Sequence, residues 1–164
     1  MATRSGPYKR ILVPVDGSRT STRGLKEALR LAKACGAKLR LIHVVDTMIA
    51  ARGAALDYNA ADLIDVLAEQ GGKTLAQAKA AAGKARVRCE TAQFESNAGR
   101  VADSIVREAR RWRADLIVMG THGRRGFSHL VLGSDAELVV RSSPVPVLLV
   151  RAPQVAKRGA RSGR

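Results

Sequence analysis

Aromatic residues, cysteines and long apolar runs are all scarce in this chain of 164 residues. Phe, Trp and Tyr make up only 3% of the sequence, so the core must be aliphatic. The chain therefore has few platforms on which the bases of a single-stranded nucleic acid could stack. The two cysteines, Cys35 and Cys89, are too few and too far apart for a disulfide framework or a zinc site. We expect two reduced thiols in a globular domain.

No stretch approaches the roughly 18 consecutive apolar residues that a membrane-spanning helix requires. Residues 1–7 carry a charge, but no apolar segment follows them, so they do not resemble a secretion signal. Hydrophobic residues make up 46% of the chain, and its length suits a single domain with a normal core. We therefore expect a cytoplasmic protein without a membrane partner.

Basic residues outnumber acidic ones by 29 to 14, which gives a formal net charge of +15. Such an excess suggests an anionic partner, for example a nucleic acid or a nucleotide. Many of the cations fall either on a helical segment that begins near Arg19 or in the tail at 152–164. We interpret the charge as a solvated helix face and a basic, disordered tail. Nucleic-acid binding is the weaker alternative, and its signature would be an affinity that falls steeply with salt.

Five short apolar segments alternate with longer helical patterns along the chain. Continuous apolar runs of this kind are typical of parallel strands that are covered on both faces. With right-handed crossovers, the alternation predicts an α/β fold, a doubly wound five-stranded parallel sheet with helices on both faces, as in Rossmann-like domains. The five predicted strands are 11–15, 39–45, 86–94, 116–119 and 145–150.

Two segments between the strands have weaker patterns. Thr47 to Leu56 shows little periodicity and is expected to be a loop. The second helix, about Asp57 to Ala82, contains the pair Gly71-Gly72. Each glycine costs about 1 kcal/mol relative to alanine in a helix, which predicts a break or a bend at this pair.

The last predicted strand belongs at an edge of the sheet. Pro146 lacks the backbone N–H group that a central strand needs. The apolar run that follows it would leave an unprotected edge, and such edges pair with other chains. A homodimer formed through Val145–Val150 is the resulting hypothesis.

A glycine-rich segment begins where the fourth strand ends, at Met119. Its spacing is Gly120-x-x-Gly123, nine further residues, and then Gly133-Ser134 at the start of a helix. Glycines let backbone amides approach an anion closely, and a helix start adds free N–H groups and a positive dipole end. The pattern favours a polyphosphate site, although a glycine loop without a ligand remains an alternative.

The same spacing resembles the ATP-binding signature of the universal stress protein family. Three flanking segments are similar to the family's strands in the same order, namely Tyr8 to Ser18, Leu41 to Val45 and Ser142 to Val150. The resemblance covers about residues 8–151. It leaves 1–7 as a short extension and 152–164 as the basic tail.

The resemblance implies a regulatory module that binds ATP, with Mg²⁺ held by the phosphates and no catalytic residue. A slow ATPase or phosphotransferase is the alternative, although the sequence has no Walker or kinase motif. The implied site runs from the adenosine end to the phosphates. Its residues are Pro14, Val15, Asp16, Val44, Met119, Gly120, His122, Gly123, Arg124, Arg125, Gly133, Ser134 and Asp135.

Several of these residues also have a purely structural interpretation. Asp16 lies in an Asp-Gly-Ser turn, which is common at strand ends. Asp135 stands where the family often has a small apolar residue, and its carboxylate either repels phosphates or stabilises the helix N-terminus. His43, His122 and His129 form no ligand motif, so we expect structural or peripheral roles for them.

Overall fold

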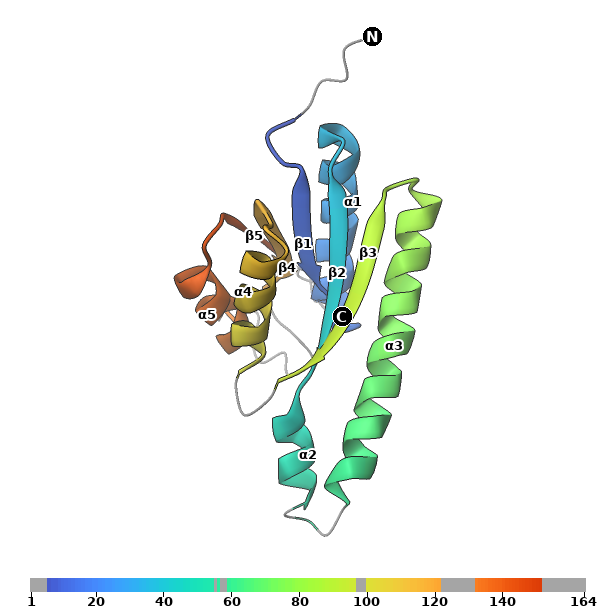
Figure 1. The fold of residues 1–164 in the computed structure, drawn as a ribbon, viewed down its shortest axis with the longest axis vertical. Coiled ribbons are helices and arrows are strands. Elements are labelled where there is room, and N and C mark those ends of the chain that lie inside the picture. Colours follow the sequence, from blue (N-terminus) through green and yellow to red (C-terminus); the bar gives the residue numbers. More distant parts are fainter. Residues whose placement is uncertain (1–5, 55, 57–58, 97–99, 122–131, 152–164) are drawn as a thin grey trace, which may run out of the picture.

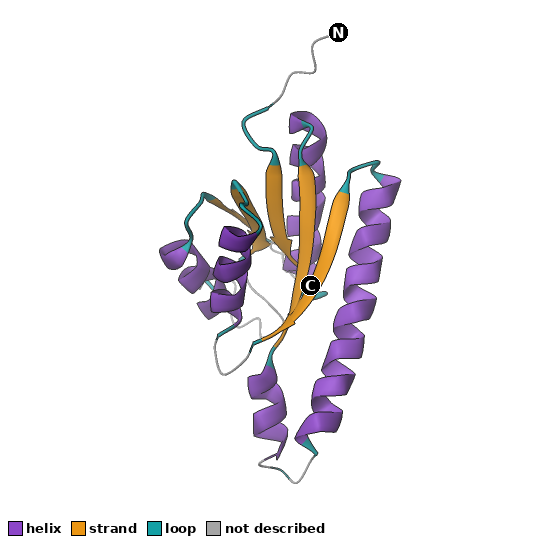
Figure 2. Ribbon diagram, in the orientation of Figure 1, coloured by secondary structure: helices purple, strands orange, loops and turns teal. Residues whose placement is uncertain are grey.

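Strands and helices alternate along the chain in the computed structural model, which describes residues 6–54, 56, 59–96, 100–121 and 132–151 (Figure 1). Figure 2 shows the strands side by side in one sheet, with helices on both sides of it. The elements are β1 (Arg10–Pro14), α1 (Arg19–Cys35), β2 (Lys38–Val45), α2 (Thr47–Ala54), α3 (Ala60–Lys84), β3 (Cys89–Glu95), α4 (Val101–Arg111), β4 (Leu116–Gly120), α5 (Ser134–Ser142) and β5 (Val147–Val150).

The five strands form one parallel sheet in the order β3-β2-β1-β4-β5. In the register of the sheet, Ile11 of β1 pairs with Leu39 of β2 on one side and with Leu116 of β4 on the other. The chain therefore steps outward from β1 to β3 and then returns to the other side of β1. The predicted doubly wound, Rossmann-like fold is confirmed, and its switch point lies between β1 and β4.

Each face of the sheet is covered by its own pair of helices. Ile11 and Val13 are fully buried in a cluster with α1 and α3, whereas Leu12, between them, is fully buried in a cluster with α4 and α5. This alternation explains why the strands read as continuous apolar runs. None of the helices in the described part of the chain is both long and apolar enough to cross a membrane.

The last strand lies at an edge of the sheet, as Pro146 predicts. It begins at Val147 and not at Val145. Pro146 still contributes its carbonyl oxygen, which accepts a hydrogen bond of 3.0 Å from Ile117 N–H. The missing N–H of Pro146 therefore shortens the strand by its first residues but leaves its pairing with β4 intact.

The segment after β2 is a helix, and the expectation of a loop at Thr47 to Leu56 was wrong. The Asp46 carboxylate accepts a hydrogen bond from Met48 N–H (3.0 Å) at the start of α2. Thr47 Oγ1 donates to the carbonyl oxygen of Ser96 (3.0 Å), and Ala50 is 1% exposed. Tertiary anchoring at one end and a single buried face thus stabilise a short helix whose apolar pattern is weak.

The helix α3 runs without a break from Ala60 to Lys84, so of the break or bend predicted at Gly71-Gly72 the break is wrong. Gly71 lies directly against the ring of His43. A Cβ atom at Gly71 would stand 2.3 Å from His43 Cδ2, which is far inside van der Waals contact. The glycine is therefore required by close packing between α3 and β2, and its low helix propensity is tolerated.

We predict opposite effects for alanine at these two neighbouring glycines. Gly71→Ala should lower the free energy of unfolding by about 1 to 3 kcal/mol, because the His43 ring is buried and cannot move aside. Gly72→Ala should be neutral or stabilising by up to about 1 kcal/mol, because its nearest neighbour, Gln93 Oε1, would be 4.0 Å away. Urea denaturation of both variants checks the pair, and equal losses would contradict the packing explanation.

Three helices that lead into strands end in the same way. In α1, α3 and α4 the chain turns through a residue in the left-handed conformation, at Gly36 (φ 69°), Arg86 (φ 56°) and Arg113 (φ 52°). The next N–H group then bonds back into the last helical turn, as Val87 does to Ala82 (3.0 Å). Glycine is the usual residue at this position, so the two arginines are unfavourable for stability.

Replacing these arginines by glycine should therefore stabilise the fold. For Arg86→Gly and Arg113→Gly we predict a gain of about 0.5 to 1 kcal/mol each in the free energy of unfolding, because the left-handed conformation costs glycine nothing sterically. Arg88→Gly is the matched control, because Arg88 is not in the left-handed region and gains no such relief. Thermal unfolding measures all three, and a lower melting temperature for the first two would refute the prediction.

Candidate functional site

The carboxyl end of β1 is held tightly against β2. Val15 N–H donates to the carbonyl oxygen of Ile42 (2.8 Å). His43 Nδ1 lies 2.7 Å from the carbonyl oxygen of Val15, which can only accept, so this nitrogen carries a proton. His43 is 4% exposed and also packs on Gly71. The structural role predicted for His43 fits these contacts. They also hold Pro14 and Val15 in place at the carboxyl end of the central strand.

Asp16 organises the turn between β1 and α1. Its carboxylate Oδ1 accepts a hydrogen bond from Ser18 N–H (2.8 Å), and its own N–H donates to Ser21 Oγ (3.2 Å). Ser18 Oγ in turn accepts from Ser21 N–H (3.1 Å) and caps α1. The turn passes through Gly17 with φ +81°. Asp16 thus has the structural role that its turn motif suggests, and it lies at the switch point of the sheet.

The end of β4 contacts the beginning of α1 through backbone atoms. A Cβ at Gly120 would lie 2.7 Å from the carbonyl carbon of Thr20, and one at Gly24 would lie 3.2 Å from Gly120 N. Met119, the preceding residue, is 7% exposed in the core cluster below α4 and α5. Glycine at 120 is therefore required by packing against α1, a constraint that the sequence pattern alone did not reveal.

The glycine-rich segment starts and ends at the same place. The carbonyl oxygen of Thr121 accepts a hydrogen bond from Gly133 N–H (2.9 Å), and Thr121 N–H donates to the carbonyl oxygen of Val150 (3.1 Å). The two ends of the segment are thus joined to each other, and the first of them is also joined to β5. Its middle, residues 122–131, lies outside the described residues, and five predicted residues fall within it: His122, Gly123, Arg124, Arg125 and His129.

The first turn of α5 has the features of an anion site. Its N-cap is Gly133, which has no side chain to accept from the first N–H groups of the helix, whereas Ser18 caps α1. Those N–H groups have no partner within the helix, and they lie at its positive end. Ser134 is exposed beside them. This donor set fits a phosphate group, and it lies at the base of the glycine-rich segment.

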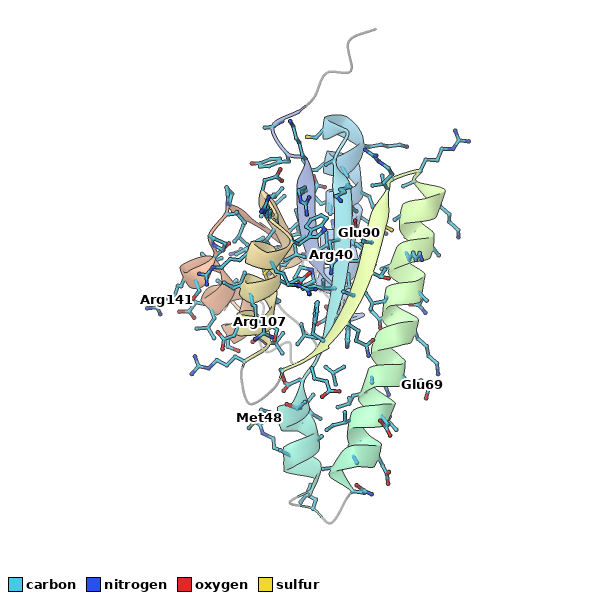
Figure 3. All side chains as sticks on the ribbon, in the orientation of Figure 1. Arg40, Met48, Glu69, Glu90, Arg107 and Arg141 are labelled. Atoms are coloured by element: carbon cyan, nitrogen blue, oxygen red, sulfur yellow. The ribbon has the colours of Figure 1, made fainter. Side chains whose placement is uncertain are left out.

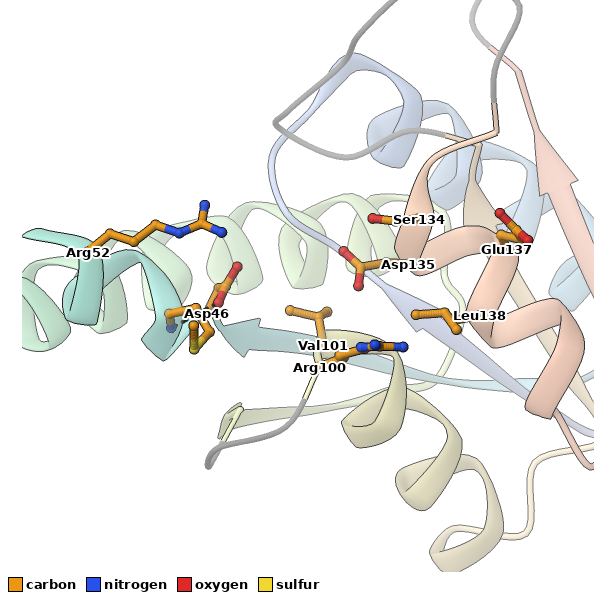
Figure 4. Close-up of a pocket in the computed structure, with 9 residues that line it drawn as sticks. Asp46, Arg52, Arg100, Val101, Ser134, Asp135, Glu137 and Leu138 are labelled. Atoms are coloured by element: carbon orange, nitrogen blue, oxygen red, sulfur yellow. Dashed lines mark hydrogen bonds between the residues drawn. The ribbon is translucent and has the colours of Figure 1, made fainter.

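A pocket of about 470 Å³ opens beside this helix start (Figure 4). In Figure 4, Ser134 and Asp135 border it from α5, and Arg52 extends from α2 on the opposite side. Two of the predicted site residues, Ser134 and Asp135, therefore line it. Among the described residues, the lining consists of Asp46, Met48, Arg52, Arg100, Val101, Ser134, Asp135, Glu137 and Leu138.

The other described site residues are not part of the described lining of this pocket. Val44 is half-buried on β2 and packs against the core cluster under α4 and α5. Pro14, Val15 and Asp16 end β1, and Met119 and Gly120 end β4. The structure thus brings the described members of the predicted set to the carboxyl end of the sheet, at neighbouring strand ends and one helix start.

Sequence reasoning missed the charged side chains of the described pocket lining, apart from Asp135. Asp46 directly follows β2, and a polar residue at a strand's carboxyl end is a signal that was available. Arg100 directly precedes α4. Arg52 was missed because its segment was expected to be a loop. Two cations and the carboxylates of Asp46, Asp135 and Glu137 share the lining, so the pocket has mixed charge.

Known proteins resemble this chain over most of its length. Residues 7–151 match the sequence model of the Universal stress protein family. A universal stress protein of Methanocaldococcus jannaschii is 36% identical over 147 residues, which cover 90% of this chain and 84% of the relative.

Solved structures agree with this match. A universal stress family protein from Burkholderia pseudomallei superposes with a TM-score of 0.72 at 33% identity, covering 90% of this chain and 99% of that one. A universal stress protein in complex with cAMP superposes with a TM-score of 0.62 at 26% identity, covering 89% of this chain and 98% of that one. The sequence match, the coverage and the shared sheet lead to one conclusion: the chain belongs to the universal stress protein family.

Proposed function

We propose that this protein is a nucleotide-responsive regulatory module that binds ATP at the carboxyl edge of its sheet. The observation that carries the proposal is the start of α5, an uncapped helix N-terminus that joins the glycine-rich segment at the switch point. The relative in complex with cAMP supports an adenine nucleotide as the ligand class. A binding role, and not catalysis, is the function proposed.

The proposed roles of individual residues are those that the resemblance to the family implies. Pro14, Val15, Asp16 and Val44, at the ends of β1 and β2, would contact adenosine. Gly123, Gly133 and Ser134 would contact the phosphates through backbone N–H groups and the Ser134 hydroxyl, with His122, Arg124 and Arg125 in the same segment. Met119 and Gly120 would form the floor, and Mg²⁺ would be held by the phosphate oxygens.

The negative charge of Asp135 affects where phosphates can bind in this site. It lies in the first turn of α5, where a carboxylate stabilises the helix dipole, and it also lines the pocket. Arg52 and Arg100 line the same pocket and offset its negative charge. We therefore infer that the phosphates bind on the Ser134 side of the helix start.

A carboxylate at position 134 should weaken nucleotide binding without lowering the stability of the fold. Ser134→Asp is expected to weaken ATP binding at least tenfold, about 1.4 kcal/mol, because it places like charges together. Its effect on stability should be neutral or favourable, because an acidic residue in the first turn of a helix is stabilising. Titration calorimetry with ATP and Mg²⁺, together with thermal unfolding, measures both effects.

The matched control is Ser142→Asp, which makes the same charge change at an exposed residue at the far end of α5. Its ATP affinity should stay within about twofold of the unmodified protein, since the added charge is more than a Debye length from the site. No binding heat with the unmodified protein would refute the ligand. Equal losses in both variants would refute the placement of the phosphates.

The regulatory module is further proposed to act as a homodimer through the edge strand. β5 has a neighbour, β4, on one side only in the described sheet, and Leu148 is 36% exposed on it. An apolar edge strand of this kind can pair with a second copy across a two-fold axis. The predicted contact is Val145–Val150.

Lysine at position 148 should prevent this pairing. Leu148→Lys places two like charges across the predicted two-fold axis, so the protein should sediment as a monomer at micromolar concentration, whereas the unmodified protein sediments as a dimer. The control is Thr91→Lys on β3, at the opposite edge, where Thr91 is also exposed. A monomeric unmodified protein, or a dimer that survives Leu148→Lys, would contradict the proposal.

A further inference from the structure

The amino end of the sheet gathers cations from four separate segments of the chain, each of which leads into a strand. The amino ends of β3, β2, β1 and β4 lie next to one another, and backbone hydrogen bonds join the residues just before and at them. Leu39 N–H donates to the carbonyl oxygen of Arg88 (2.9 Å), and Lys38 N–H donates to that of Lys9 (3.0 Å). We call this surface the amino-end face. Its exposed cations that form no ion pair in the described structure are Lys9, Lys33, Lys84, Arg86, Arg88, Arg110 and Arg113.

The acidic groups of this region are already engaged by the scaffold. The Asp115 carboxylate accepts hydrogen bonds from the backbone N–H groups of Lys9 (2.7 Å) and Arg10 (3.1 Å). Glu108, whose side chain is 4% exposed, forms ion pairs with Arg40 (2.6 Å) and Arg111 (2.8 Å). These two carboxylates bind backbone N–H groups and the side chains of Arg40 and Arg111. They form no ion pair with the seven cations named above.

Glu90 completes this inner network. It pairs with Lys38 (3.0 Å) and Arg40 (2.8 Å) and accepts a hydrogen bond from Trp112 Nε1 (3.1 Å). Figure 3 shows Arg40 and Glu90 close together on the sheet. The hydrogen bond from Lys38 is the main cause that holds the pKa of Glu90 below its ordinary value. In the described structure, none of the seven cations of the amino-end face forms an ion pair with Glu90 or with any other carboxylate.

Two of the exposed cations lower the stability of the fold. Arg86 and Arg113 occupy the left-handed positions at which α1 has Gly36. Cations in the last turn of a helix, such as Lys33, Lys84 and Arg110, are explained by the helix dipole. The dipole does not explain a left-handed arginine where glycine is the favoured residue. A function that needs positive charge at the two turns does explain it.

The chemistry of the face identifies the partner. Guanidinium groups pair bidentately with phosphates, and four of the seven cations are arginines. Trp112 is 7% exposed, with the Arg10 guanidinium 4.5 Å and the Lys38 ammonium 5.4 Å from its ring centre, so it is not free to stack on a base. Single-stranded nucleic acids, which bind through stacking, are therefore disfavoured.

An anionic membrane fits less well than a duplex. Peripheral membrane surfaces insert apolar side chains between the lipid headgroups. None of the large apolar side chains that are exposed in the described structure lies in the four segments of the amino-end face: they are Met48, Ile49, Leu56, Val66, Val140 and Leu148.

The width of the face suits B-form DNA. Four adjacent strands with a spacing of about 4.8 Å place the turns of Arg86 and Arg113 about 14 Å apart. The major groove of B-form DNA is about 12 Å wide, so cations at the two ends of this row can reach phosphates on both of its sides. The deep, narrow major groove of an RNA duplex does not match.

We propose that the amino-end face binds the phosphate backbone of double-stranded DNA without sequence specificity, at the opposite end of the sheet from the nucleotide site. The interaction is electrostatic, and it does not depend on the proposed binding of ATP. It uses Arg86 and Arg113 as its outer contacts and Lys9 between them.

The test is fluorescence anisotropy with a labelled 20-base-pair DNA duplex, the full chain and a series of salt concentrations. The double variant Arg86→Gly/Arg113→Gly should bind about tenfold more weakly at 50 mM salt. The slope of log affinity against log salt should fall by about 2, because two phosphate contacts are lost. The melting temperature should not fall, so weaker binding cannot be assigned to misfolding.

A second double variant separates the face from the net charge. Arg23→Gln/Lys26→Gln removes the same charge from exposed positions in the first half of α1. Its DNA affinity should stay within about threefold of the unmodified chain. An equal loss in both double variants would overturn the proposal, as would unchanged binding by the glycine variant or no duplex binding at all.

Three competing probes complete the test at the same ionic strength: a 20-nucleotide oligo-dT strand, a 20-base-pair RNA duplex and vesicles that contain phosphatidylserine. Weaker binding of all three than of the DNA duplex supports the proposal. Preferential binding of any one of them overturns the assignment of the partner.

Discussion

The end of β4 lies against the first turns of α1 with no side chain between their backbones, and the geometry of the carboxyl edge depends on this contact. Gly120 faces Thr20, and Gly24 faces the backbone of Gly120. Two glycines permit a distance that any larger residue would prevent. The contact fixes the turn at Asp16 relative to Thr121, where the glycine-rich segment leaves the sheet. The starts of α1 and α5 therefore share one corner of the molecule.

Much of the fold could be predicted because its signals are local. Strands buried on both faces read as continuous apolar runs, and Pro146 marks an edge by its chemistry alone. The errors arose where a distant contact overrides a local preference. Gly71 weakens a helix on any propensity scale, but it is the only residue that leaves room for the ring of His43. The helix α2 is short and weakly patterned, and it is anchored by Ser96 from another part of the chain.

The candidate site was predictable in outline and not in its lining. The glycine spacing and the strand ends indicated the carboxyl end of the sheet, where the described pocket lies, because parallel strands bring their carboxyl ends together. The charges at Arg52 and Arg100 come from segments without a motif, so only the three-dimensional structure brings them to the pocket. The same holds for the amino-end face. Its cations are dispersed along the chain between residues 9 and 113. From the sequence alone, the basic charge was therefore interpreted as one helix face and a tail.

The parallel sheet has a consequence for the accessibility of its two ends. The carboxyl ends of its strands lead to the corner that holds Ser134, and the amino ends carry the exposed cations of the amino-end face. A large partner bound at the amino ends would therefore be separated from Ser134 by the length of the strands. Small solutes could then still reach that corner while the other end is covered.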